Sequence, residues 1–209
     1  MVFEYGETEV EYLKKKDKRL GLVIETIGPI RREVNPCLFG SLINAVIGQQ
    51  ISAKAQKTVW NRMVEDLGNI TPETVCSCSQ ERIQRYGMTF RKAAIIQGIA
   101  EKVRTGALDL QALSCKVDAE VCAELCALDG IGIWTAEMLM IFSMQRPNVI
   151  SYGDLAIRRG LCMLHRHKTL TRELFEKYRR RYSPYASVAS LYLWELAAGT
   201  TPIDFSRKG

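Results

Sequence analysis

The sequence predicts an all-α protein, and three observations support this prediction. Apolar residues recur every three or four positions through most of the chain, which is the spacing of an amphipathic helix. Glycine, proline and small polar residues stand between these segments, where they would end one helix and begin the next. No segment shows a persuasive alternation of apolar and polar residues, which a half-buried strand would require.

The first helix is expected over residues 9–27. Its apolar residues lie at helical spacing, and Gly28 and Pro29 follow it as a stop signal. The charged run Lys14–Arg19 is expected to be mostly a solvated face. After Pro36, the pattern predicts two helices joined near Gly48.

Further helix signals follow along the chain. Thr71 is expected to cap a helix that has Pro72 at its first position. The segment 81–106 predicts a helix, a turn at Gly87 and a second helix, and residues 121–128 predict another. The run Trp134–Met144 is helix-like, and residues 155–167 and 170–199 predict helices separated near Lys168 and Pro184.

Composition bounds the class of protein. The chain has 209 residues, 47% of them hydrophobic, which is enough for a substantial core. The formal net charge of +6 favours a polyanionic partner. No apolar run approaches the length of a membrane span and the N-terminal residues lack the pattern of a signal peptide, so we expect an intracellular, cytoplasmic protein without a membrane partner.

The cysteines and histidines do not predict a metal site. Seven cysteines are scattered through helix-like segments, which indicates reduced thiols packed as small apolar side chains. His165 and His167 have no evident third ligand, and we expect them to be exposed or to face DNA. The neighbouring cysteines lack the paired spacing of a zinc site; they are Cys76, Cys78, Cys115, Cys122 and Cys126.

The stretch from Leu128 to Gly160 is the most informative part of the chain. Gly130 and Gly132 allow a sharp turn at the start of a helix, where bare N–H groups and the helix dipole favour an anion such as a phosphate. A plain helix-to-helix turn is about equally favoured by the spacing alone. Asp154 immediately precedes a basic helix, whose N-terminal amides favour an ionised carboxylate.

This stretch resembles the helix-hairpin-helix and Gly/Pro–Asp signature of base-excision DNA glycosylases, and most of all the 3-methyladenine DNA glycosylase II branch. The resemblance spans nearly the whole chain, in a short form without the N-terminal β-rich domain of longer relatives. The family usually has proline where this chain has Asp129. The matching residues are Leu128, Gly130, Ile131, Gly132, Trp134, Thr135, Ala136 and Asp154.

The resemblance implies a fold and a domain organisation. We expect a single glycosylase unit over residues 1–209, built of two helical subdomains with a DNA-binding cleft between them. Residues 35–153 would form the central subdomain that contains the hairpin. Residues 1–34 and 154–209 would form the second.

The resemblance also implies roles for particular residues. Asp154 would stabilise the sugar cation and help to activate water. Gln50, with Ile51 as the second choice, would fill the gap left by the extruded base; without the resemblance, ordinary turn capping would be the better interpretation of Gln49 and Gln50. The DNA backbone would be contacted by Gly130, Gly132, Thr135 and Arg158.

The base pocket is expected to be aromatic, because an alkylated purine is cationic and an electron-rich ring attracts it. Trp134 and Tyr185 match pocket positions of the resembling branch, Met138 replaces an aromatic pocket residue, and Tyr152 is a weaker candidate. Tyr86 is also a weaker candidate, whereas Trp60 and Trp194 are expected in the core. Arg91 and Lys92 could contact the DNA backbone, and a plain surface role for them is about equally favoured.

The expected activity is that of a monofunctional enzyme. Relatives that also cut the strand have a lysine at the position of Trp134, and an indole cannot form a Schiff base. We therefore expect excision of alkylated purines from double-stranded DNA by a monomer, associated with the nucleoid if the protein is bacterial. No cofactor is expected: there is no cysteine after Cys162 for the iron–sulfur cluster of some relatives, although the hairpin could hold a monovalent cation through its carbonyls.

Two other functions stay open at this point. One is a glycosylase for a deaminated, mismatched or oxidised base. The other is a non-enzymatic helix-hairpin-helix module that only binds DNA. Asp154 and the aromatic residues argue against the second, because phosphate binding benefits from neither.

Overall fold

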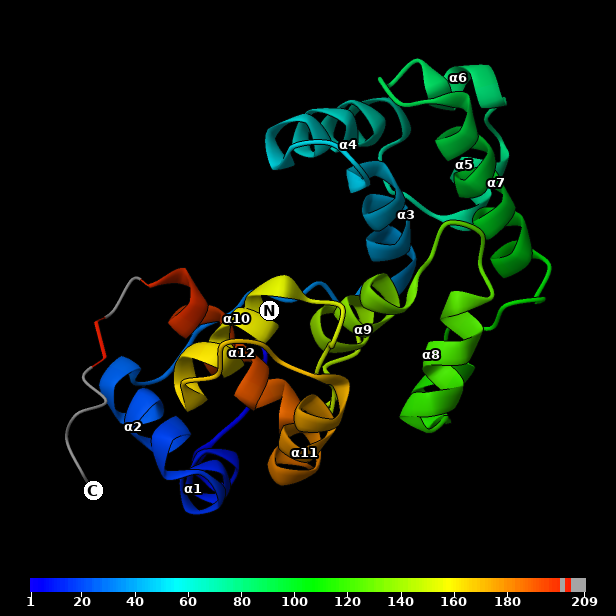
Figure 1. Cartoon of the computed structure of the whole chain (residues 1–209). Helices are drawn as coiled ribbons and strands as arrows, with labels where there is room; N and C mark the ends of the chain where they lie inside the picture. Colours follow the sequence, from blue (N-terminus) through cyan, green and yellow to red (C-terminus); the bar gives the residue numbers. More distant parts are fainter. Residues whose placement is uncertain (200–201, 204–209) are drawn as a thin grey trace. The chain divides into compact units, whose positions relative to one another are not determined.

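The computed structural model describes residues 1–199 and 202–203, and in these residues the only regular secondary structure is helical apart from one isolated bridge between Val2 and Glu33. The prediction of an all-α fold is confirmed. The chain divides into two compact units, one of residues 1–34 and 140–209 and the other of residues 35–139 (Figure 1). In the described part of the chain, no helix is long and apolar enough to cross a membrane.

The unit of residues 35–139 contains the helices α3 (Leu38–Gly48), α4 (Ala53–Leu67), α5 (Pro72–Cys76), α6 (Gln80–Gln84), α7 (Phe90–Arg104) and α8 (Asp118–Cys126), the 3-10 helix η1 (Ala112–Cys115) and the start of α9 (Ile133–Phe142). Helix α7 packs against α3, α5 and α6. The core is formed by residues that lie at helical spacing, among them Leu42, Ile43, Val46, Ile47 and Ile96. As expected, the Thr71 hydroxyl caps α5, which has Pro72 at its first position.

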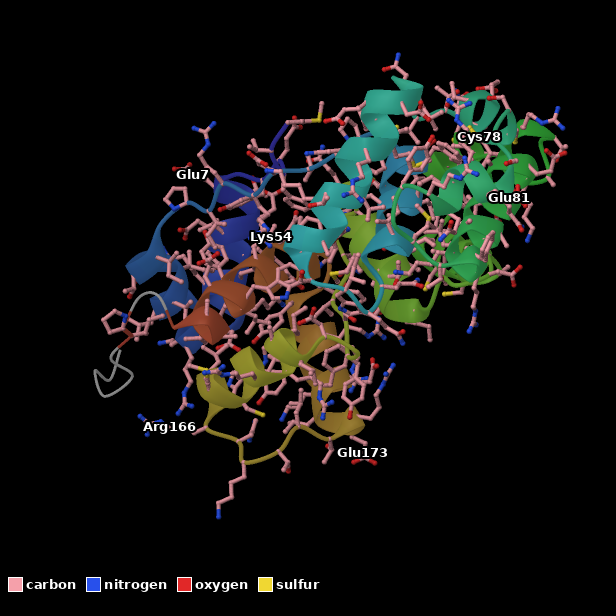
Figure 2. All side chains as sticks on the ribbon, turned by 90° about the horizontal axis from the view of Figure 1, so that it is seen from above. Glu7, Lys54, Cys78, Glu81, Arg166 and Glu173 are labelled. Carbon is pink, nitrogen blue, oxygen red and sulfur yellow. The ribbon has the colours of Figure 1, made fainter. Side chains whose placement is uncertain are left out.

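The unit of residues 1–34 and 140–209 contains α1 (Glu7–Lys16), α2 (Lys18–Ile27), the end of α9, α10 (Leu155–His165), α11 (Arg172–Tyr182) and α12 (Ala186–Ala198). Helix α12 is the centre of this unit: it packs against α1, α2, α10 and α11, and every residue from Ala186 to Leu193 is buried. Figure 2 shows Arg166 at the end of α10 and Glu173 at the start of α11, on either side of their connection.

The expected single helix over residues 9–27 is wrong, because the chain breaks at Asp17. This residue is extended and its carboxylate accepts hydrogen bonds from the main-chain N–H groups of Arg19 and Leu20, so that it caps α2. The side chain is only 5% exposed, inside a charged run that the pattern assigned mostly to solvent. Helical spacing continues across the break, so periodicity alone does not reveal it.

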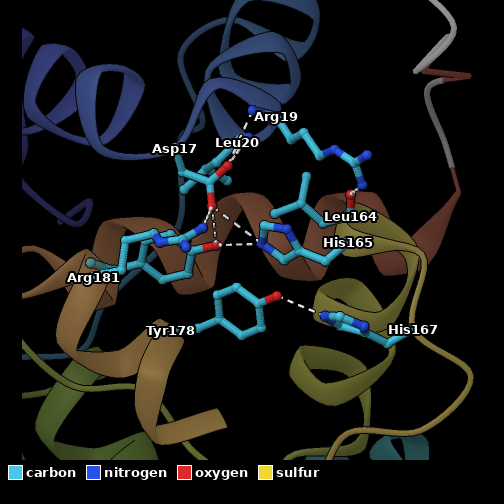
Figure 3. Close-up of polar contacts among 9 residues, drawn as sticks. Asp17, Arg19, Leu20, Leu164, His165, His167, Tyr178 and Arg181 are labelled. Carbon is cyan, nitrogen blue, oxygen red and sulfur yellow. Dashed lines mark hydrogen bonds and ion pairs between the residues drawn. The ribbon is translucent and has the colours of Figure 1, made fainter. Parts of the chain in front are cut away.

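A buried polar network explains the break (Figure 3). The Oδ2 atom of Asp17 lies 3.0 Å from Arg181 Nη1, 3.1 Å from the Tyr182 hydroxyl and 3.2 Å from His165 Nε2. Burial would raise the pKa of Asp17, but the hydrogen bonds from His165 and Arg181 and the charge of His165 hold it well below its usual range. The expectation that His165 is exposed is therefore wrong: its side chain is only 9% exposed and pairs with Asp17.

The segment after α9 belongs with α12. Ser187 joins the two through several hydrogen bonds: among them, its N–H donates to the Pro147 carbonyl (3.0 Å), its hydroxyl donates to the Arg146 carbonyl (2.5 Å), and the Val149 N–H donates to its Oγ (2.9 Å). The boundary between the units therefore falls at 139/140, within α9, and the interpretation of the sequence set it at 153/154.

Candidate active site

The turn from Leu128 to Gly132 joins α8 to α9. The Ile131 N–H donates to the Leu128 carbonyl at 3.1 Å, and the Ala136 N–H donates to the Gly132 carbonyl at 2.9 Å, which starts the hydrogen-bond ladder of α9. Gly130 has a φ of +77°, which favours glycine, and a Cβ there would lie 3.1 Å from the Ile95 Cδ1 atom, so that Ile95 would have to shift.

The start of α9 is open to a ligand. Gly130 and Gly132 are both exposed, and a Cβ at Gly132 would meet nothing within 4 Å. Thr135 is half-buried in the first turn. The first N–H groups of a helix have no partner within the helix, so this end can bind an anion through the main chain.

The turn between α3 and α4 is tied to the hairpin turn. The Gln49 side-chain amide donates to the Gly130 carbonyl at 2.6 Å. The Lys92 ammonium donates to the carbonyls of Ile47 and Gln49 at 2.8 and 2.6 Å, and burial lowers the pKa of Lys92 from its usual value. Lys92 therefore holds the end of α3.

Gln50 and Ile51 are the exposed residues of this turn. Gln50 has a φ of +57°, in the left-handed region that a residue with a side chain rarely adopts. Ile51 is 40% exposed, which is unusual for a large apolar side chain. Both residues expected to fill the gap in the duplex thus lie on the surface of the turn. Hydrogen bonds from Gln49 and Lys92 hold this turn in place.

Trp134 and Met138 lie one helical turn apart on α9 and so share a face. Trp134 is 50% exposed, and Met138 is half-buried. An exposed indole at the start of a helix forms a surface that a flat, electron-poor ligand can stack on.

Asp154 is held at the start of α10. Its Oδ1 atom accepts hydrogen bonds from the main-chain N–H of Ile157 at 2.9 Å and from the indole N–H of Trp194 at 3.2 Å. The residue is 8% exposed. Both N–H donors therefore hold the carboxylate at the positive end of the helix dipole.

Tyr152 and Arg158 flank Asp154 in sequence and contact each other. The Arg158 guanidinium lies 4.9 Å from the centroid of the Tyr152 ring, and the Arg172 guanidinium lies 4.8 Å from the same centroid. Phe175 packs edge-on against the ring at 5.1 Å. These contacts favour a structural role for Tyr152.

The Nε atom of Arg158 is buried without a hydrogen-bond partner among the described residues, which suits an arginine that binds an anion.

Tyr185 stands at the start of α12. It is half-buried, and its ring packs edge-on against Tyr12 at a centroid distance of 5.2 Å. Tyr86, a weaker pocket candidate, is buried and donates its hydroxyl to Asp66 at 2.5 Å. Burial and this hydrogen bond raise the pKa of Tyr86 to about 12, which identifies it as a structural residue.

The candidate residues fall into both units of the chain. One group lies in residues 35–139 and consists of Gln50, Ile51, Gly130, Gly132, Trp134, Thr135 and Met138. The other lies in residues 140–209 and consists of Tyr152, Asp154, Arg158 and Tyr185. In the part of the chain that the structure describes, no group of three or more histidine, cysteine, aspartate or glutamate side chains could hold a metal ion.

Three residues have roles in the site that the sequence did not predict. Gln49 and Lys92 brace the exposed turn, and Trp194, which was expected in the core, is half-buried and hydrogen-bonds Asp154. The partners of Gln49 and Trp194 lie far along the chain, so no local spacing indicates them.

Comparisons with known proteins agree with this architecture. The family model for the HhH-GPD superfamily base excision DNA repair protein matches residues 43–184. DNA-3-methyladenine glycosylase 1 of Schizosaccharomyces pombe is 31% identical over 206 residues, which cover 95% of this chain and 90% of that protein.

Two solved structures have the same fold. The crystal structure of a DNA-3-methyladenine glycosidase from Bacillus halodurans superposes with a TM-score of 0.88 at 33% identity, over 96% of this chain and 93% of that chain. The S. pombe 3-methyladenine DNA glycosylase Mag1 in complex with abasic DNA has a TM-score of 0.75 at 29% identity, over 90% and 95% of the two chains.

Proposed function

Because this chain belongs to the HhH-GPD superfamily of base excision DNA repair proteins, we propose that it is a monofunctional DNA glycosylase that excises alkylated purines of the 3-methyladenine type. The observation that carries the proposal is Asp154, a nearly buried carboxylate held by two N–H donors at the start of α10. Relatives named DNA-3-methyladenine glycosylase are similar over almost the whole chain, which supports the choice of substrate.

The reaction is hydrolysis of the N-glycosidic bond. As this bond breaks, its electron pair leaves with the purine and positive charge develops on the deoxyribose. The ionised carboxylate of Asp154 stabilises this charge electrostatically. Water then adds its oxygen to the anomeric carbon and loses a proton, for which Asp154 is the acceptor. The products are the free base and an abasic site.

Alkylation at a ring nitrogen makes the purine cationic, so that it leaves as a neutral base and needs little help from an acid. Selection can therefore rest on stacking. The exposed indole of Trp134 offers a face for cation–π attraction, with Met138 beside it on α9 as an adaptable apolar contact. Tyr185 is the further pocket candidate.

DNA binding uses the main chain and a few side chains. The N–H groups at the start of α9, with Gly130, Gly132 and Thr135, would bind one phosphate. Arg158 would bind another. Gln50, with Ile51 beside it, would occupy the space left when the damaged nucleotide turns out of the duplex, and so offset part of the unstacking cost.

The hairpin also fits a monovalent cation. The carbonyl of Leu128 accepts a hydrogen bond from the Ile131 N–H and that of Gly130 accepts one from Gln49, and a carbonyl oxygen can accept at a second lone pair. A bound cation would neutralise part of the charge of an adjacent phosphate. No step of the reaction requires it.

The proposed partner of the protein is damaged double-stranded DNA, which a monomer would bind. Repair of DNA would place the protein inside the cell.

The test is release of free base from a panel of duplexes, each containing one lesion. We expect 3-methyladenine to be released, and we expect deaminated or oxidised bases to be released far more slowly. Borohydride should trap no covalent complex, because Trp134 replaces the lysine that strand-cutting relatives use. If the protein binds DNA but releases no alkylated base, it is instead a non-enzymatic DNA-binding module.

A further inference from the structure

The strongest observation beyond the proposed reaction is the contact between Trp194 and Asp154. The two residues lie on different helices of the same unit, and the indole Nε1 donates to Asp154 Oδ1 at 3.2 Å. The same oxygen accepts the Ile157 N–H at 2.9 Å. One donor therefore comes from the helix that Asp154 begins, and the other comes from α12.

Close packing of α10 on α12 makes this contact possible. A Cβ at Gly160 of α10 would lie 2.5 Å from the main-chain oxygen of Leu193 on α12, so only glycine allows the two backbones to approach this closely. Trp194 directly follows Leu193 and thus lies at the crossing point of the helices. Figure 1 shows α10 and α12 side by side, as their contacts also indicate.

The orientation of the indole is itself fixed. The Phe142 ring packs against it at a centroid distance of 5.4 Å with an interplanar angle of 31°, and the Arg32 guanidinium lies 5.6 Å from the Phe142 centroid. A side chain packed in this way loses little further freedom when it donates a hydrogen bond. Its N–H is preorganised for the carboxylate.

We propose that Trp194 is a positioning residue for the glycosylase reaction: its indole N–H fixes the plane of the Asp154 carboxylate. A helix N-cap needs only the bond to Ile157, and this bond comes from a single direction. The second donor restricts rotation of the carboxylate. A hydrogen bond to a carboxylate is charge-assisted and therefore stronger than one between neutral groups.

This inference rests on the proposed function, since it concerns the group that stabilises the sugar cation. It assigns Trp194 no contact with the base. The role differs from simple packing, because packing depends on the shape of the ring and the proposed role depends on the N–H. Replacements that keep the ring and remove the N–H therefore separate the two.

The experiment compares Trp194→Phe with Trp60→Phe, a matched change at a half-buried tryptophan of the other unit. Single-turnover release of 3-methyladenine is measured, together with the Kd for the lesion-containing duplex. We expect Trp194→Phe to release the base roughly 10-fold more slowly with an unchanged Kd, as the loss of a hydrogen bond to a charged group implies. Trp60→Phe should behave as wild type in both measurements.

A second variant removes doubt about folding. Site-specific incorporation of benzothienylalanine at position 194 keeps the shape of the indole and replaces the N–H with sulfur. The proposal predicts the same slower release with an unchanged Kd. A wild-type rate in this variant would overturn it, as would a loss that lies in the Kd instead of the rate.

Asp154→Asn distinguishes the failure of this inference from the failure of the proposed function. If Asp154→Asn is inactive and the position-194 variants are normal, only the role of Trp194 is wrong. If Asp154→Asn also releases 3-methyladenine at the wild-type rate, the proposed reaction itself is wrong.

Discussion

The side-chain amide of Gln49 donates a 2.6 Å hydrogen bond to the carbonyl of Gly130, and so connects the turn between α3 and α4 to the hairpin turn. The first turn carries the exposed Gln50 and Ile51, and the second begins the anion-binding end of α9. The bond therefore sets the spacing between the segment proposed to fill the duplex and the segment proposed to bind its phosphate.

Gln49→Ala should weaken both functions of this region. The variant loses one exposed hydrogen bond, which costs stability by only about 1 kcal/mol. Base release and affinity for damaged duplex should both fall, because the two DNA-contacting turns are no longer held at one distance. The matched control is Thr58→Ala, which removes an exposed hydroxyl bonded within α4. Equal rates and affinities for Gln49→Ala and the control would refute the role of this bond.

Gln50→Gly should be at least as stable as the wild type and yet a poorer enzyme. The φ of +57° at Gln50 is unfavourable for a residue with a side chain by about 1 kcal/mol, and glycine adopts it readily. The variant has no side chain to fill the gap in the duplex. We expect slower release from a fully paired duplex and little change when the lesion lies opposite an abasic site, where the stack is already weakened. An equal fall in the release rate on both substrates would contradict the proposal that the Gln50 side chain fills the gap.

Trp134→Ala should reduce the preference for cationic bases. Cation–π attraction to an indole contributes about 0.5–2 kcal/mol, so release of 3-methyladenine should slow by roughly 3- to 30-fold. Trp134→Phe should lie between this variant and the wild type, because a phenyl ring is a weaker partner for a cation. The measurement is the ratio of release rates for 3-methyladenine and for a neutral base such as hypoxanthine. An unchanged ratio of release rates in Trp134→Ala would show that Trp134 does not take part in selecting the base.

Asp17→Asn should destabilise the fold near neutral pH, by roughly 3 kcal/mol, because it removes one partner of a buried ion pair. The pKa of Asp17 is lowered in the folded protein, so its contribution is fully present above the ordinary value of about 3.9 and is lost as the pH falls below it. Asparagine keeps the cap of α2.

The check on Asp17 is denaturant unfolding of both proteins from pH 7 downwards. The difference in free energy of unfolding between wild type and Asp17→Asn should be largest at pH 7 and should shrink below about pH 4. A difference that stays constant over this range would show that the charge of Asp17 does not contribute.

The features that could be read from the sequence are local ones. The cap at Thr71, the turn at Gly130 and the placement of Asp154 before α10 each depend on residues within a few positions of one another. Local conformational preferences and the apolar period are sufficient to predict them.

The features that could not be read depend on contacts between distant parts of the chain. Asp17 breaks a helical pattern because His165 and Arg181 stabilise its carboxylate in the core. Trp194 appears as one more apolar residue of α12 until the close approach at Gly160 places it against Asp154. Single-sequence patterns carry no signal for such pairs.

The central claim is that the charge of Asp154 drives base release, and Asp154→Asn tests it most directly. Asparagine is almost the same size and is an equally good helix cap, so the fold and the binding of DNA should be preserved. The measurement is single-turnover release of 3-methyladenine from methylated duplex DNA by wild type and variant at equal saturation. We predict a loss of roughly 100-fold or more, as for other lost charge stabilisers. A folded, DNA-binding Asp154→Asn protein that releases the base at close to the wild-type rate would contradict it.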